Sequence, residues 1–120
     1  MASERLLSFE QIDGVTVGRL QATEIISGLD EILQVKLSEM CDADQPVKFI
    51  LDLSNMTYLC TTGLGTLVMF LKRVKNCDGQ LALAGLKGHC RNVLRVTRLE
   101  DVFDLCDDVP EAIEKIRGAA

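Results

Sequence analysis

The run of residues 47–53 constrains the fold of this chain more than any other segment. Five of its seven residues are apolar, and only Lys48 and Asp52 interrupt them. So dense an apolar pattern is typical of a strand that is covered on both faces in a parallel sheet. Parallel strands are joined by crossovers that usually contain a helix, and an amphipathic helical pattern follows at residues 62–75. We therefore expect an α/β sheet with residues 47–53 as its central strand.

The rest of the chain alternates between strand-like and helix-like segments. Asp13-Gly14 separates the first two strands and favours a tight hairpin turn. Strands that alternate with helices form a mostly parallel sheet joined by right-handed crossovers. The order therefore predicts a single α/β domain, with a mixed, mostly parallel sheet, an N-terminal hairpin and helices packed against the sheet. The predicted strands span residues 6–12, 15–20, 47–53, 80–84 and 102–106, and the predicted helices span residues 29–41, 62–75, 87–97 and 110–117.

Composition and charge exclude several classes of protein. At 120 residues the chain suits one domain, and its net charge of -5 repels nucleic acid on average. No apolar stretch approaches the roughly 18 residues of a membrane span, and the N-terminus lacks the apolar run of a signal peptide. We expect a cytoplasmic protein that binds neither nucleic acid nor membrane. The predicted domain covers residues 5–116, with frayed termini at residues 1–4 and 117–120.

The cysteines indicate neither a disulfide framework nor a metal site. They are odd in number and scattered, with no C-x-x-C pair, and the chain has a single histidine. We expect five reduced thiols, no metal and no cofactor. The five cysteines are Cys41, Cys60, Cys77, Cys90 and Cys106.

One basic run stands out in this acidic chain. It recurs at helical spacing among apolar residues, and such a run is usually the solvated face of a helix. We therefore expect the basic run to be a solvated helix face. We also expect His89 to lie on a solvated turn of the same helix without a partner. The run consists of Lys87, Arg91, Arg95 and Arg98.

Residues 60–65 form the most informative motif, because they lie where an extended segment passes into a helix. In open α/β sheets, binding sites gather at such points. The hydroxyls of Thr61 and Thr62 are placed to cap free backbone N–H groups, while Gly63 and Gly65 allow a tight turn and a close approach. A helix N-terminus also favours a negative charge by about 0.3 to 1 kcal/mol, so a phosphate is favoured here. The same residues equally fit an ordinary capped helix start. The motif reads Cys60-Thr61-Thr62-Gly63-Leu64-Gly65.

Residues 49–67 resemble the core of the STAS family, the anti-sigma factor antagonists of bacteria. In that family a buried strand with an L-D-L ending leads through a short extended segment to an Asp-Ser-Ser/Thr-Gly-Leu-Gly motif that opens a helix. The similarity continues in residues 79–86, which resemble the next strand, and in residues 93–103, which resemble the pattern V-L-x-x-T-x-L-x-x-V-F. The order of elements agrees over residues 5–116, so the resemblance implies a STAS-like domain.

The resemblance implies a binding switch rather than an enzyme. In the family, the unphosphorylated antagonist binds an anti-sigma factor that is also a serine/threonine kinase of the histidine-kinase-like ATPase type, and this frees a sigma factor. The kinase then phosphorylates the first hydroxyl residue of the motif and the complex dissociates, until a PP2C-type phosphatase removes the phosphate. By position that residue is Thr61, with Thr62 as the alternative.

Two other functions stay open. Cys60 stands where the family usually has Asp, and Thr61 where Ser is commoner, which leaves room for a non-phosphorylated STAS scaffold or ligand-sensing module. Alternatively, Cys60 is a thiol-based redox sensor, because a helix dipole favours a thiolate. Against this, no histidine or resolving cysteine is close to Cys60 in sequence.

The helix that follows the motif is expected to complete a partner-binding surface. Its exposed candidates are Thr66, Met69 and Lys72, although Met69 also suits a core position. The whole predicted surface consists of Cys60, Thr61, Thr62, Gly63, Leu64, Gly65, Thr66, Met69 and Lys72.

Overall fold

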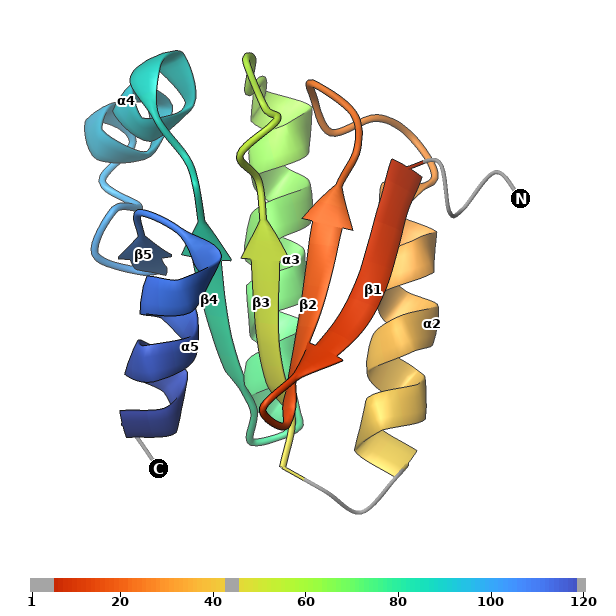
Figure 1. Cartoon of the computed structure of the whole chain (residues 1–120). Helices are drawn as coiled ribbons and strands as arrows, with labels where there is room; N and C mark the ends of the chain where they lie inside the picture. Colours follow the sequence, from red (N-terminus) through yellow and green to blue (C-terminus); the bar gives the residue numbers. More distant parts are fainter. Residues whose placement is uncertain (1–5, 43–45, 119–120) are drawn as a thin grey trace.

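Five strands form one sheet in the order β1-β2-β3-β4-β5 (Figure 1). The computed structural model describes residues 6–42 and 46–118. Strand β1 runs antiparallel to β2, and the other neighbours are parallel, so the predicted mixed, mostly parallel sheet is confirmed. The strands are β1 (Leu7–Ile12), β2 (Val15–Leu20), β3 (Lys48–Asp52), β4 (Gln80–Ala84) and β5 (Asp104–Cys106), and the helices are α2 (Leu29–Asp42), α3 (Thr61–Asn76), α4 (Gly88–Val96) and α5 (Val109–Gly118).

The N-terminal hairpin turns at the predicted dipeptide. Asp13 and Gly14 both have a positive φ, 53° and 81°, which is the backbone of a type I′ turn and matches the twist of the flanking strands. Ile12 and Val15 pair directly on either side of it.

Strand β3 lies in the middle of the sheet and is covered on both faces, as predicted. Phe49 and Leu51 belong to the larger core cluster, which contains the buried residues of α2 and α3, while Ile50 belongs to the cluster that contains the buried residues of α5. In Figure 1, α3 lies behind the sheet and α5 in front of it. The Phe49 ring meets the rings of Phe9 and Phe70 edge to face, with centroids 6.1 and 5.1 Å apart. This packing fixes the position of β3 and of the start of the loop that follows it.

Two of the cysteines correct the expectation of five reduced thiols. Cys41, in the last turn of α2, forms a disulfide with Cys77, which follows α3. The two cysteines are 36 positions apart in sequence, but α2 and α3 pack against each other and the disulfide joins their C-terminal ends. Cys60, Cys90 and Cys106 are free, and burial raises the pKa of the Cys90 and Cys106 thiols, which keeps both protonated at neutral pH.

Seven of the nine elements differ from their predicted bounds, β5 by two residues and the others by one residue at one or both ends. Strand β5 begins at Asp104 rather than at residue 102, because the Val102 N–H donates to the Leu99 carbonyl in a turn. Helix α5 continues through Gly118, so residues 117 and 118 are helical; the other residues expected to fray, 1–4 and 119–120, lie outside the described residues. Within residues 6–42 and 46–118, no helix is both long and apolar enough to span a membrane.

Candidate functional site

The loop between β3 and α3 carries the motif at the carboxyl edge of the parallel strands, at the top of Figure 1. Several contacts hold it to the rest of the fold. The Asn55 side-chain amide donates to the Leu20 carbonyl at 3.1 Å, and the Thr57 N–H donates to the Thr23 carbonyl at 2.8 Å. Met56 and Leu59 are buried in the core. The motif therefore starts from a fixed position.

Cys60 is the N-cap of α3. Its backbone is extended, and its Sγ accepts the Gly63 N–H at 3.5 Å. The expectation that Thr61 or Thr62 caps the helix is wrong, since both are already helical residues. N-cap propensity favours threonine over cysteine. The sequence therefore predicted a cap after Cys60 rather than at it. The thiol fills the position that a carboxylate or hydroxyl would otherwise occupy.

Thr61 and Thr62 are exposed on the first turn of α3. Among the described residues, the hydrogen bonds of the site include none from the hydroxyl of either residue; the nearby Thr66 hydroxyl donates to the Thr62 carbonyl at 3.2 Å. Both residues are therefore accessible, and neither hydroxyl is engaged in the cap. This is the geometry that a modifying enzyme or a binding partner requires.

The two glycines of the motif have different surroundings. Gly63 is buried, and a Cβ there would lie 3.3 Å from both Ile25 Cβ and Leu59 Cδ1. Gly65 is exposed, and a Cβ there would meet no atom within 4 Å. Close packing explains the first glycine. Nothing within the described fold requires the second.

Alanine at Gly65 is expected to stabilise the protein by about 0.5 to 1 kcal/mol, because glycine inside a helix has that unfavourable propensity relative to alanine. Urea unfolding of Gly65→Ala measures the gain. Gly63→Ala is the matched control: it has the same propensity but crowds two side chains, so it should be the less stable variant. Equal stability of the two would contradict the assignment of Gly63 as the packed glycine.

The predicted partner-binding residues fall into three groups, which are buried, partly buried and exposed. Gly63 and Leu64 are buried and support the start of α3, whereas Thr66 and Cys60 are partly buried. Exposed side chains recur every three to four residues along one stripe of the helix. Met69 is 46% exposed, so it is not a core residue. The exposed members of the predicted surface are Thr61, Thr62, Gly65, Met69 and Lys72.

Tyr58 and His89 form a contact that the sequence did not reveal. Their rings stack with centroids 5.3 Å apart and an angle of 7° between the planes. The expectation that His89 has no partner is therefore wrong. Tyr58 is 51% exposed and lies two residues before Cys60, while His89 lies in the first turn of α4. The loops that follow β3 and β4 meet because these strands are parallel neighbours, and that adjacency was the available signal.

Charged groups near the motif form ion pairs rather than a metal site. Arg19 on β2 pairs with Asp52 at the end of β3, 3.3 Å away, and with Glu10 on β1. Across the part of the chain that the structure describes, no three metal-ligating side chains come together. The chemistry of the edge thus comes from hydroxyls, an aromatic stack and a helix N-terminus.

The family of this fold follows from a comparison with family models. The model of the STAS domain matches residues 7–112. The chain belongs to the STAS domain family. Among its relatives is BtrV of Bordetella bronchiseptica, provisionally named an anti-sigma factor antagonist, which is 27% identical over 113 residues, or 94% of this chain and 96% of BtrV.

Solved structures of other STAS proteins share the fold. TM1081 of Thermotoga maritima, provisionally described as an anti-sigma factor antagonist, superposes with a TM-score of 0.76 at 22% identity over 98% of this chain and 99% of TM1081. The anti-sigma factor antagonist SpoIIAA in its unphosphorylated form gives 0.73 at 18% identity over 93% and 96% of the two chains. Bacillus SpoIIAA in its phosphorylated form gives 0.69 at 18% identity over 92% and 99%. The α/β domain of this STAS chain is therefore the fold that these proteins share.

Proposed function

We propose that this STAS domain is an anti-sigma factor antagonist whose binding is switched off by phosphorylation of Thr61. The observation that carries the proposal is the division of roles at the start of α3. Cys60 caps the helix through its thiol, which leaves the Thr61 hydroxyl exposed and unengaged. Thr62 is the alternative acceptor, since its side chain is exposed on the same turn.

A phosphate on Thr61 would act through its charge at the contact surface. It adds about -1.5 to -2 charges, and the N-terminus of α3 accommodates them within the free protein. In a complex the same charges would be buried against the partner, where desolvation and repulsion oppose binding. Because Thr61 lies beside the exposed stripe of α3, no rearrangement of the domain is needed.

The partners that fit this role are those of the family resemblance. The antagonist would bind an anti-sigma factor that is also a kinase of the histidine-kinase-like ATPase type, and so free a sigma factor in the bacterial cytoplasm. A PP2C-type phosphatase would restore the unphosphorylated form. The domain itself contributes binding and no catalysis. Support comes from the antagonist names of its relatives and from the exposed threonines.

Incubation with the kinase and ATP, followed by phosphopeptide mapping, tests the modification. Phosphate on Thr61 that Thr61→Ala abolishes and Thr62→Ala preserves supports the proposal. Tight partner binding without phosphate on either threonine would favour the non-phosphorylated scaffold instead. Alkylation of Cys60 at the rate of an ordinary exposed thiol would remove the redox-sensor alternative.

Glutamate at Thr61 is expected to weaken partner binding tenfold or more, because it brings a carboxylate into the contact. Isothermal titration with the purified anti-sigma factor measures the change. Ser38→Glu is the matched control, since it adds the same charge at an exposed position of α2. An affinity of Thr61→Glu equal to that of Ser38→Glu would refute a contact at Thr61.

A further inference from the structure

The α4 face is a basic surface that the motif does not explain. Residues 84–99 contain four of the 13 basic residues of the chain and none of its 18 acidic residues. The rest of the chain is therefore strongly acidic, whereas this segment is basic. We define the α4 face as Arg95, Val96, Arg98 and the Tyr58–His89 stack.

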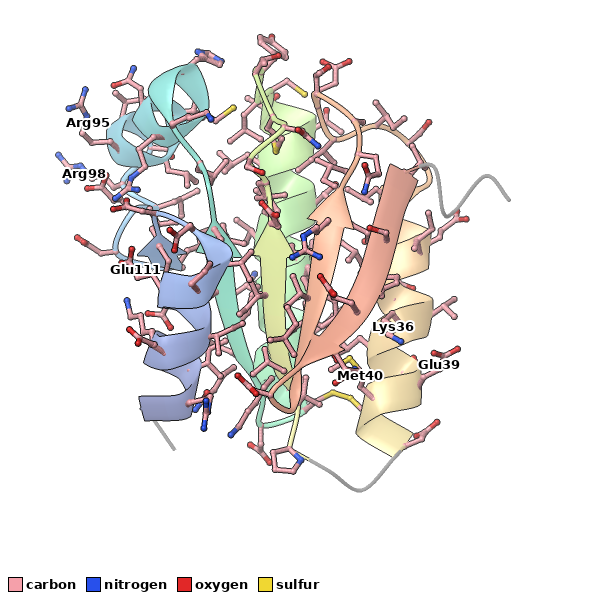
Figure 2. The ribbon with its side chains drawn as sticks, in the orientation of Figure 1. Lys36, Glu39, Met40, Arg95, Arg98 and Glu111 are labelled. Carbon is pink, nitrogen blue, oxygen red and sulfur yellow. A yellow bond between two sulfur atoms is a disulfide. The ribbon has the colours of Figure 1, made fainter. Side chains whose placement is uncertain are left out.

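Two arginines of this face are free to meet an external charge. Arg91 is paired with Glu100 at 3.6 Å. Arg95 donates to the Asn92 side chain, and no carboxylate among the described residues lies within 4 Å of Arg95 or Arg98. Figure 2 shows both side chains projecting away from the body of the molecule at the end of α4. Their charges are thus not neutralised within the described fold.

An exposed apolar side chain accompanies the arginines. Val96 is 67% exposed, more than any other large apolar residue of the described chain. Arginine beside apolar and aromatic side chains is the composition enriched at protein–protein contacts. The Tyr58–His89 stack adds exposed aromatic surface at the opposite end of α4.

Arg98 occupies a backbone position that suits glycine. Its φ is +62°, and the Leu99 N–H donates to the Leu94 carbonyl at 2.9 Å, which is the pattern of a Schellman C-cap. Glycine is the usual residue there because an L side chain is strained in the left-handed region. Stability alone would favour glycine at this position. The arginine therefore indicates a role other than stabilising the fold.

The α4 face and the motif fit within one contact. Tyr58 lies two residues before Cys60 and stacks on His89, and α4 extends from His89 to Arg95 over about 9 Å at 1.5 Å per residue. A typical interface covers about 800 Å² on each partner, which is roughly 30 Å across. A partner seated on Thr61 would therefore reach the arginines.

We infer that the α4 face is the second half of the partner-binding surface and takes an acidic surface of the anti-sigma factor. This inference rests on the proposed function. The arginines steer an oppositely charged partner during encounter, and Val96 is covered once the complex has formed. Phosphorylation of the motif on α3 then controls whether the complex forms, and the arginines of α4 raise its association rate.

Association kinetics with the purified anti-sigma factor test the inference. Arg95→Glu/Arg98→Glu should lower the association rate constant at least tenfold at low salt and flatten its dependence on ionic strength. Lys75→Glu, at the far end of α3, is the control for a charge reversal at an exposed lysine. Binding of the double variant at the wild-type rate, with the wild-type salt dependence, would overturn the inference and leave the proposed function standing.

Arg98→Gly separates binding from folding. It should unfold at a higher urea concentration than the wild type, because it relieves the strained backbone, and yet associate several-fold more slowly with the anti-sigma factor. A variant that is more stable and associates at the wild-type rate would count against a binding role for Arg98.

A second probe does not depend on the anti-sigma factor. In an NMR titration of the full chain, a ten-residue polyglutamate peptide should shift the amide signals of Arg95, Val96 and Arg98, and added salt or Arg95→Glu/Arg98→Glu should abolish the shifts. Polylysine of equal length should leave these signals unchanged. Shifts spread over the whole surface, or none at α4, would overturn the inference even if the wild-type chain fails to bind the anti-sigma factor.

Discussion

Alanine at Gly85 is expected to lower the free energy of unfolding by about 2 to 5 kcal/mol. Gly85 follows β4 with a φ of +85°, where an L residue costs about 1 to 2 kcal/mol. A Cβ there would also lie 2.7 Å from Ser54 Cβ and 2.9 Å from Ser54 Cα. Because the obstacle includes backbone, the overlap cannot be relieved by a rotamer change and adds about 1 to 3 kcal/mol.

Gly14→Ala is the matched control for this experiment. Gly14 has nearly the same φ, +81°, but a Cβ there would meet nothing within 4 Å, so its variant carries the backbone strain without the overlap. Urea unfolding of both variants isolates the contact with Ser54 as the difference between them. Equal destabilisation by the two substitutions would show that the approach of Gly85 to Ser54 is not tight in solution.

The same substitution has a consequence for the site. Ser54 begins the loop that carries the motif, and its N–H donates to the Asp52 carboxylate at 3.1 Å. Pushing Ser54 away from Gly85 would displace this loop. We expect folded Gly85→Ala protein to bind the anti-sigma factor more weakly, with no residue of the contact surface changed.

Reduction of the Cys41–Cys77 disulfide is expected to lower the free energy of unfolding by about 3 to 4 kcal/mol. The bond closes a long loop, with a sequence separation of 36, and a crosslink of that length removes this much entropy from the unfolded chain in the loop-closure account. Urea unfolding with and without a dithiol reductant measures the change.

The double variant Cys41→Ser/Cys77→Ser provides the control. It should unfold at the midpoint of the reduced wild type and should not respond to reductant. A wild-type midpoint that stays constant on reduction would mean that the two cysteines are not bonded in solution.

Much of the fold could be predicted because local pattern and tertiary environment agree. The apolar run at residues 47–53 is buried on both faces, as its composition requires, and Asp13-Gly14 adopts the two positive φ angles that its turn needs. The stripe of α3 follows from residues spaced three and four apart. In each case the neighbours in sequence determine the outcome.

The remaining features of the fold and of the site depend on residues that are distant in sequence. The Cys41–Cys77 bond requires the side-by-side packing of α2 and α3, and the Tyr58–His89 stack requires two loops to meet above adjacent strands. The cap at Cys60 was missed for a different reason, since statistical preference favoured its threonine neighbours. Spacing carries no signal for contacts of this kind.

Helix α3 has its two chemically addressable positions at opposite ends. Sixteen residues place Thr61 about 24 Å from the end that adjoins Cys77. Proteolysis of folded proteins follows the population of the open form, so reducing the bond would shorten the lifetime of the protein while leaving its affinity unchanged. Phosphate at Thr61 would instead lower the affinity for the partner and leave the lifetime of the protein unchanged. If Thr61 is the switch that we propose, a cell could adjust the abundance of this STAS domain through the disulfide and its partner binding through phosphorylation, each without affecting the other.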